Sequence, residues 1–111
     1  MIESSFQSSI AQLLQEGWTT TLGFTMPIQN EEWAVFQDTR KEGDFEMARG
    51  GWLTDFMDPS GMLGIFTQGN AYNDPDYNSA AFEAQILAAQ TATTSAAHFE
   101  ALYAAHELFM A

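Results

Sequence analysis

The start of the chain has the hydrophobic spacing of an amphipathic helix. Ser4 and Gln7 form a capping box ahead of apolar residues that recur every three or four positions. These apolar residues are Phe6, Ile10, Leu13 and Leu14. Gly17 follows, and glycine is typical of the position just after a helix. The pattern predicts a helix from about residue 4 to residue 17.

A strand, a helix and a second strand are predicted next. Residues 24–28 alternate apolar and polar side chains, and Pro27, which lacks an N–H donor, places this strand at a sheet edge or a strand end. Asn30 is a suitable N-cap for a helix that ends at Gly43. The residues expected to face inward from this helix are Trp33, Val35 and Phe36. Residues 45–47 alternate again, so the order is that of a parallel βαβ unit.

The C-terminal half is predicted to be mainly helical. Residues 58–66, which begin with an Asp-Pro pair, indicate a short helix, and a loop rich in turn-forming residues follows from Gly69 to Asn78. Two helices are predicted from Ser79 onward, separated at residues 91–95, because β-branched and hydroxyl residues favour caps over helix interiors. Their apolar positions are Phe82, Ile86 and Leu87 on the first helix, and Phe99, Leu102, Tyr103 and Phe109 on the second. The predicted fold class is α/β, with a βαβ unit and a helix-rich C-terminal half.

The composition is that of a folded domain with a strong negative charge. Hydrophobic residues make up 46% of the 111 residues, unlike the depleted composition of disordered chains, and the length suits one domain. Fifteen Asp and Glu against three Lys and Arg give a net charge of −12, and no basic residue follows Arg49. Such a charge repels phosphate backbones and anionic lipids, so it argues against nucleic-acid and membrane-surface binding and favours a cationic ligand. The chain has no cysteine, which excludes disulfides and thiolate chemistry.

Residues 48–58 form the segment with the most chemistry. Arg49, a glycine pair, Trp52 and Asp55 stand side by side between a predicted strand and a turn. Glycines let a backbone approach a bound molecule, a Trp ring supplies a flat apolar wall, and Arg and Asp recognise opposite charges. Taken by residue type alone, the same set also suits packing at a strand-to-loop junction. The segment therefore suggests binding chemistry, with a packing role as the alternative.

Residues 48–59 also resemble the "ARxGW-xxD-Y-xDP" signature of the bacterial extracellular solute-binding proteins of the oligopeptide and nickel type, the ligand receptors of ABC importers. Further blocks follow the family order over roughly residues 10 to 108. They are Leu22–Met26 ("LGI-x-V"), Glu32–Phe36 ("EW-x-x-F"), Gly43–Glu46 ("G-x-[FY]-[DE]"), Asn73–Asn78 ("Y-x-[ND]-P-x-[YF]-D") and Ala101–Glu107 ("LY-x-x-A-E").

The resemblance implies that residues 1–111 are a single-domain fragment of the C-terminal lobe of a two-lobe protein several times longer. Its parent is expected outside the cytoplasmic membrane, where it would bind a peptide between two lobes and deliver it to an ABC permease, without enzymatic activity, cofactor or metal. The expected ligand-binding residues are Arg49, Gly50, Gly51, Trp52, Leu53 and Asp55. Asp55 matches the carboxylate that holds the ligand's α-amino group, Trp52 lines a side-chain pocket, and Arg49 is available to the ligand's carboxylate. A fragment of this kind is also expected to self-associate through an open sheet edge or cleft surface.

Three departures from the family pattern bear on the ligand and the packing. Phe56 replaces the usual Tyr, Asn78 replaces Asp, and Phe99 replaces an Arg that many relatives carry. A non-transport sensor or interaction module built on the same lobe, and a binder of nickel chelates or sugars, remain alternatives.

Other constellations favour ordinary structural roles. Asp74, Asp76 and Asn78 have the spacing that starts a calcium loop, but Ser79 stands where glycine is required and Gln85 where a bidentate acid is required, so a solvated turn is expected. His98 and His106 are eight residues apart, too far for a zinc pair on one helix, and are expected to be surface or packing residues.

The remaining carboxylates and tryptophans favour structural roles over acid–base catalysis and aromatic ligand platforms. Asp55 and Asp58 have no accompanying nucleophile or phosphate loop, and Asp58 suits a helix cap. Trp18 and Trp33 are expected to be core residues.

Overall fold

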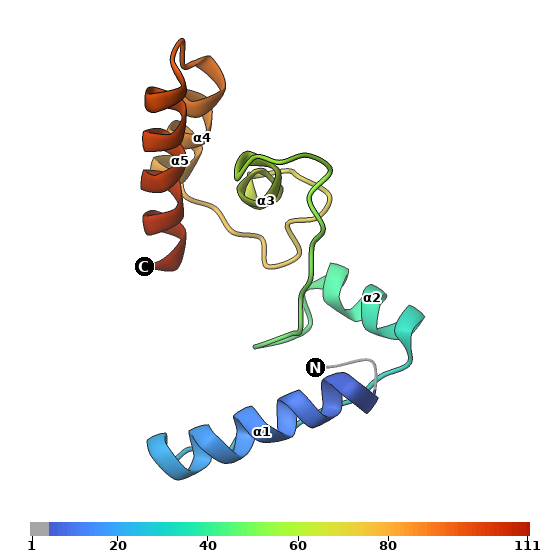
Figure 1. Ribbon diagram of the computed structural model, residues 1–111. Coiled ribbons are helices and arrows are strands. Elements are labelled where there is room, and N and C mark those ends of the chain that lie inside the picture. The colour runs from blue at the N-terminus through green and yellow to red at the C-terminus, as the bar shows by residue number, and fades with distance from the viewer. Residues whose placement is uncertain (1–4) are drawn as a thin grey trace. The chain divides into compact units, whose positions relative to one another are not determined.

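The computed structural model describes residues 5–111, which form two compact units, the first ending at Gly50 and the second covering Gly51–Ala111. The first unit contains helices α1 (Ser5–Leu22) and α2 (Trp33–Glu42) (Figure 1). The second contains α3 (Ser60–Leu63), a 3-10 turn η1 (Gly64–Phe66), α4 (Ala80–Thr91) and α5 (Ser95–Met110). Among the described helices, none has both the length and the apolar character that crossing a membrane requires.

Helix α1 is longer than predicted because Gly17 does not end it. The helix continues to Leu22, and the next residue, Gly23, takes a left-handed φ of 74° while its N–H donates to the Thr19 carbonyl. A glycine ends a helix when the backbone turns left-handed, which Gly23 does and Gly17 does not. The capping box predicted at Ser4 lies outside the described residues.

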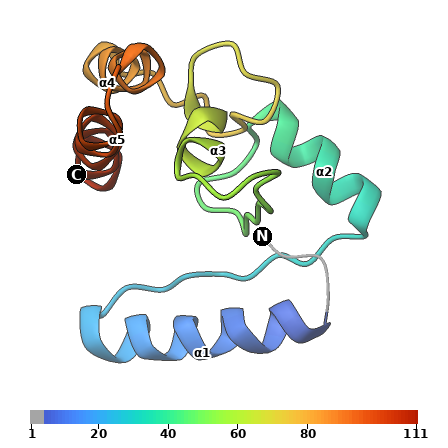
Figure 2. The same cartoon turned by 45° about the horizontal axis from the view of Figure 1, so that its top comes forward.

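The two predicted strands form no ladder within residues 5–111. After α1 the chain from 23 to 30 runs back along that helix without helical structure (Figure 2), and the Gln15 side chain donates to the Met26 carbonyl. Residues 44–49 are likewise neither helix nor strand. Alternation of apolar residues indicates a strand only where a partner strand completes the hydrogen bonds, so the βαβ unit is not confirmed.

Helix α2 ends as predicted but begins and packs differently. Gly43 ends it with φ 74°, whereas its N-cap is Glu32, whose carboxylate accepts from the Ala34 N–H, and not Asn30. Phe36 is fully buried, while Trp33 is 48% and Val35 53% exposed, so the predicted inward face is correct for one residue of three. Trp33 stacks on the Phe36 ring at 5.9 Å between centroids and is no core residue.

The second unit is built on an antiparallel helix pair, α4 and α5. Ser79 and Thr94 cap the two helices by accepting from the N–H groups of Phe82 and Ala97, and the break between the helices falls where the sequence predicts it. The short helix α3 and η1 also lie within the predicted span 58–66. The buried core consists of Leu63, Phe82, Ile86, Ala89, Ala101, Leu102 and Ala105, with Phe66, Tyr77 and Phe109 packed against it.

The inward face of this helix pair was predicted only in part. Phe82, Ile86 and Leu102 are buried, but Leu87, Phe99 and Tyr103 are 51 to 66% exposed. The contact between the two helices is instead made partly by the buried alanines 89, 101 and 105, because helices that approach closely need small side chains at the contact. The Ala-rich sequence is therefore a packing feature, as the sequence indicates.

The loop between η1 and α4 is held by asparagine side chains. The Asn73 amide donates to the carbonyls of Thr67 and Tyr77, and its oxygen accepts from the Tyr77 N–H. Asp76 takes a left-handed φ of 51° in this loop. The calcium-like spacing thus lies in a turn that leads into the Ser79 cap.

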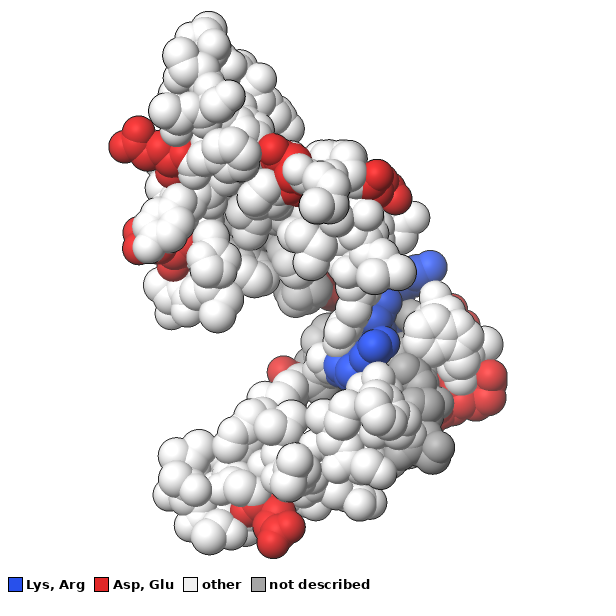
Figure 3. Space-filling view, viewed as in Figure 1, with Lys and Arg blue, Asp and Glu red and all other residues white. Residues whose placement is uncertain are grey.

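Charge is divided unevenly between the two units. All three Lys and Arg belong to the first unit, where Figure 3 shows the blue atoms gathered in one area. The second unit has no Lys or Arg and seven acidic residues: Asp55, Asp58, Asp74, Asp76, Glu83, Glu100 and Glu107. The second unit therefore attracts cations more strongly than the first unit does.

Candidate functional site

The predicted binding residues fall on both sides of the boundary between the units. Arg49 and Gly50 close the first unit, and Gly51, Trp52, Leu53 and Asp55 open the second. The Arg49 carbonyl accepts a long hydrogen bond of 3.5 Å from the Arg40 guanidinium. The candidate site in the second unit therefore consists of residues 51–58, named the binding segment below.

Trp52 is the fixed aromatic of the binding segment. Its indole N–H donates to the Gly61 carbonyl at 2.9 Å, and its ring lies 4.8 Å from the ring of Tyr72. The Tyr72 N–H is held in turn by the Asn70 side-chain oxygen at 2.9 Å, while the Tyr72 side chain is 58% exposed. The two rings form a half-open aromatic pair.

Tyr72 is a candidate site residue that the sequence did not reveal. It lies twenty positions after Trp52 and directly before the block Asn73–Asn78 that resembles the family pattern. The sequence does hold a signal for it, because Tyr72 matches the first Tyr of the family pattern "Y-x-[ND]-P-x-[YF]-D".

The middle of the binding segment points its side chains outward. Leu53 is 91%, Phe56 55% and Met57 101% exposed, and Asp55 is also exposed. Thr54 turns back, with its hydroxyl donating to the Phe56 carbonyl at 2.9 Å. An exposed carboxylate next to exposed apolar side chains is suited to a ligand with a cationic group and an apolar part.

Gly61 is required by the packing of the binding segment. A Cβ added there would lie 2.0 Å from the Thr54 hydroxyl oxygen and 3.4 Å from the Phe56 ring. The backbone of α3 therefore contacts the segment directly, and a larger residue would displace it.

Gly50 has no comparable requirement in the fold. Its φ is not positive, and a Cβ there would meet no atom within 4 Å. The chain's own conformation and packing do not explain glycine at position 50.

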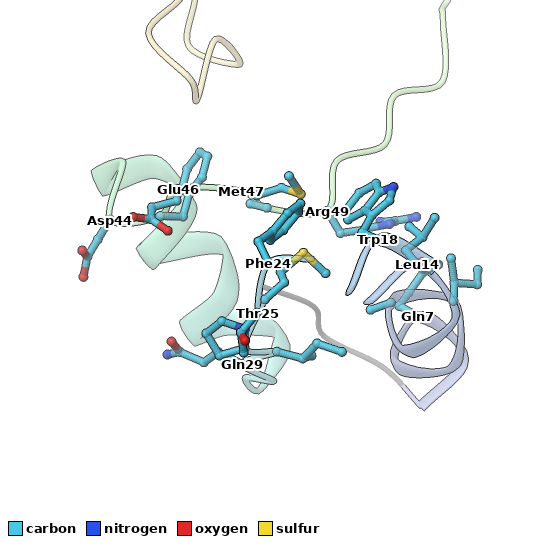
Figure 4. A pocket seen from close by; sticks show the side chains of 17 residues that line it. Gln7, Leu14, Trp18, Phe24, Thr25, Gln29, Asp44, Glu46, Met47 and Arg49 are labelled. Atoms are coloured by element: carbon cyan, nitrogen blue, oxygen red, sulfur yellow. The ribbon is translucent and has the colours of Figure 1, made fainter. Parts of the chain in front are cut away.

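Arg49 also lines a cavity of about 600 Å³ inside the first unit. Figure 4 shows Trp18, Phe24 and Met47 around this hollow, with Asp44 and Glu46 at the end away from Leu14 and Gln7. Trp18 is half-buried in its wall and is not the core residue that the sequence predicted. The cavity is mainly apolar and differs in character from the acidic second unit.

Asp58 is joined to the first turn of helix α5. Its carboxylate accepts from the Ser60 N–H at 2.9 Å and contacts His98 Nε2 at 2.9 Å, while the N-cap position of α3 itself is Pro59, one residue later than the sequence predicts. Hydrogen bonds from Ser60, and then His98, lower the pKa of Asp58 to about 2. The hydrogen bond to the Ala89 carbonyl, and then Asp58, raises the pKa of His98. The sequence expected Asp58 to cap a helix and did not pair it with His98.

Nothing in residues 5–111 brings three potential metal ligands together. The binding segment and Tyr72 together offer an exposed carboxylate and an anchored aromatic pair, which suit a non-covalent binding site.

Comparison with known proteins identifies the class. Residues 2–74 match the profile of the bacterial extracellular solute-binding proteins, family 5 Middle. The chain belongs to this family of solute-binding proteins.

Individual relatives are peptide-binding proteins by name. The chain is 32% identical over 100 residues to the periplasmic oligopeptide-binding protein OppA of Escherichia coli, covering 90% of this chain and 18% of OppA. It is 34% identical over 104 residues to the oligopeptide-binding protein OppA of Bacillus subtilis, covering 93% of this chain and 19% of that protein. The solved structure of the Escherichia coli murein tripeptide binding protein MppA matches with a TM-score of 0.92 and 28% identity, over 98% of this chain and 22% of that one. The chain thus spans about a fifth of the length of these relatives, and its fold is that of a part of a periplasmic binding protein.

Proposed function

We propose that this chain is part of the C-terminal lobe of a peptide-binding protein that serves an ABC importer. All of residues 1–111 would belong to that one lobe, and the full-length protein would enclose a peptide between two lobes. The observation that carries the proposal is Asp55, an exposed carboxylate on a binding segment anchored at Trp52, in a unit without Lys or Arg.

Asp55 is proposed to hold the α-amino group of the peptide. A carboxylate that becomes enclosed when lobes close needs a cationic partner, and the second unit supplies no Lys or Arg for it. A ligand ammonium would meet that need. The family's oligopeptide-binding members, named as such, support a peptide as the source of that ammonium.

The other predicted residues have supporting roles in this proposal. The Trp52 ring would line a pocket for a ligand side chain, with Leu53 exposed beside it. Gly50 and Gly51 would leave room for backbone hydrogen bonds to an extended peptide, which explains glycine at position 50, where the fold itself does not demand it. Arg49 would be available to a ligand carboxylate.

The α/β architecture belongs to the same proposal. Residues 24–28 and 45–47 would be strands of the lobe's sheet in the full-length protein, paired with strands outside this chain. Their alternating apolar side chains support this, since Phe24 is 44% and Met47 57% exposed beside the cavity of the first unit. They line that cavity together with other apolar side chains, and an apolar surface gathered in one place is typical of a region that another part of a protein covers.

The protein would act outside the cytoplasmic membrane as a binding protein and not as an enzyme. Relatives with periplasmic in their names, and names that describe binding, support both points. The direct test is native mass spectrometry of the full-length protein purified from its own source. Co-purified short peptides with free N-termini are expected, whereas a sugar or a nickel chelate would overturn the choice of ligand.

A further inference from the structure

His98 makes the one ion pair that ties the binding segment to helix α5 in the described part of the chain. Its Nε2 lies 2.9 Å from Asp58 Oδ2, across forty residues of sequence, and its Nδ1 lies 2.8 Å from the Ala89 carbonyl oxygen at the end of α4. The side chains of His98 and Asp58 are only 27% and 24% exposed. The ring therefore bridges α4, α5 and the end of the binding segment.

Both ring nitrogens of His98 face acceptors, and this fixes the protonation state that the geometry needs. A carbonyl oxygen and a carboxylate oxygen accept hydrogen bonds and cannot donate them. A neutral imidazole has a single N–H, so either tautomer would leave one nitrogen lone pair facing an oxygen. Only the imidazolium donates to both partners.

Asp58 connects His98 to the rest of the binding segment. It follows Asp55 by three residues, its second carboxylate oxygen accepts from the Ser60 N–H, and its own carbonyl accepts from the Gly61 N–H at 3.0 Å. Gly61 in turn holds the Trp52 indole. Asp58 is thus the point at which α3, the binding segment and the helix pair are joined.

We propose that His98 is a positioning residue for the binding segment 51–58, and that peptide affinity falls as the His98 imidazolium loses its proton. This inference rests on the proposed function, because it concerns how the same segment holds a peptide. His98 itself need not touch the ligand; it acts through Asp58 on the orientation of Asp55 and Trp52.

The surroundings of His98 contain few other charges that would compete. Helix α3 and the last turn of α4 hold no ionisable side chain, and the nearest charged residue in sequence on α5 is Glu100. Glu83 lies at the opposite end of α4, and Glu107 and His106 lie further along α5. The electrostatic attraction that acts on His98 comes from Asp58.

The binding test uses the full-length protein and the tripeptide Lys-Ala-Lys, whose charge suits the acidic lobe. Calorimetry would compare the natural protein with His98→Gln between pH 5.5 and 8.5, using about half-unit steps. At the acid end, His98→Gln should weaken binding about two- to five-fold, the range for a partly exposed ion pair. The ratio of the two affinities should approach one at the alkaline end. The α-amino group of the free peptide also titrates, near 7.7 to 8.0, but this lowers the affinity for both proteins alike and so cancels in the ratio of the two affinities.

Two further variants separate positioning from a general structural effect. His106→Gln removes the chain's other histidine, which is exposed on the same helix, and should leave the pH profile unchanged. His98→Lys keeps a permanent cation opposite Asp58 and should preserve tight binding up to pH 8.5. A constant ratio at every pH, or the same loss with His106→Gln, would overturn the inference.

A second measurement does not need the ligand. In the full-length protein labelled with ¹³C-histidine, the NMR signal missing from His98→Gln identifies His98, and its pKa should lie above the ordinary 6.5 and fall in Asp58→Asn. If the natural protein binds no peptide at any pH while this titration behaves as expected, the proposed function fails and the ion pair stands. If peptides bind but His98 titrates normally, only the inference fails.

Discussion

The indole nitrogen of Trp52 donates to the carbonyl oxygen of Gly61 at 2.9 Å, which folds the binding segment back onto the start of α3. The same Gly61 leaves just enough space for the Thr54 hydroxyl and the Phe56 ring. One glycine therefore serves both the anchored tryptophan and the packing of the loop that carries Asp55.

Gly61→Ala should destabilise the second unit. The added methyl would lie 2.0 Å from the Thr54 hydroxyl oxygen, so the segment must shift at a cost of about 1 to 3 kcal/mol, as is usual for overpacking. Urea unfolding monitored by Trp fluorescence measures this. Gly64→Ala is the matched control, because Gly64 has helical φ and open space around it; it should be neutral or stabilise by up to about 1 kcal/mol. Equal behaviour of the two variants would contradict the packing role.

Asn73→Ala should loosen the loop before α4. The Asn73 side chain makes three hydrogen bonds, to Thr67 and twice to Tyr77, and a loss of about 1 to 3 kcal/mol is expected when backbone groups lose such partners. Urea unfolding gives the free energy, and hydrogen exchange at the Tyr77 amide gives the local effect. Asn78→Ala, at an exposed neighbouring position, should stay within about 0.5 kcal/mol of the natural protein.

Stability should depend on pH through Asp58 and His98. The folded pKa of Asp58 is lowered from 3.8 to about 2, so its contribution is present above pH 3.8 and is lost as the pH falls toward 2. The folded pKa of His98 is raised from 6.5, so its contribution is complete below pH 6.5 and is lost as the pH rises through the higher, folded value. Both contributions are therefore present between about pH 4 and 6.5.

Thermal unfolding of the 111-residue chain at several pH values measures this window. His98→Gln should flatten the alkaline side of the profile and leave most of the acid side, while His106→Gln should change neither. An alkaline side that is identical in the natural chain and His98→Gln would contradict the role of the ion pair.

The 111-residue chain on its own should self-associate more strongly as salt is added. Helix α1 exposes Phe6, Leu13 and Leu22 by 63 to 71%, and residues 24–28 belong to no strand ladder within the described part of the chain. The net charge of −12 opposes association, but this repulsion is screened over about 8 Å at physiological salt, whereas apolar contact is not. Sedimentation at low and high salt is the measurement, and Leu13→Gln should reduce association. A monomer in both conditions would argue against the idea.

Local signals explain which parts of the fold the sequence predicted. The end of α2 at Gly43, the Ser79 cap and the break at residues 91–95 depend on residues within one turn of the boundary. The predicted end of α1 was wrong because either Gly17 or Gly23 could end the helix, and only the backbone conformation distinguishes them. Which side of a helix is buried depends on its neighbours in space.

Contacts between distant residues explain what the sequence missed. Leu87 and Tyr103 looked like core residues and are exposed, because alanines at 101 and 105 bring α4 and α5 together. The binding segment was recognised from its residues and its family resemblance. Its links to Tyr72 and His98 were not, since they join positions twenty and forty residues apart.

If Asp55 holds the α-amino group of a peptide, calorimetry of the full-length protein will show the loss of that contact. Asp55→Asn should weaken binding of Lys-Ala-Lys by about 2 to 5 kcal/mol, because the desolvated ammonium loses its partner. Asp38→Asn, at an exposed carboxylate on α2, serves as the control and should leave the affinity unchanged. N-acetylation of the peptide should weaken binding to the natural protein and make little further difference to Asp55→Asn. Unchanged affinity of Asp55→Asn, or preferential binding of the N-acetylated peptide, would contradict this role of Asp55.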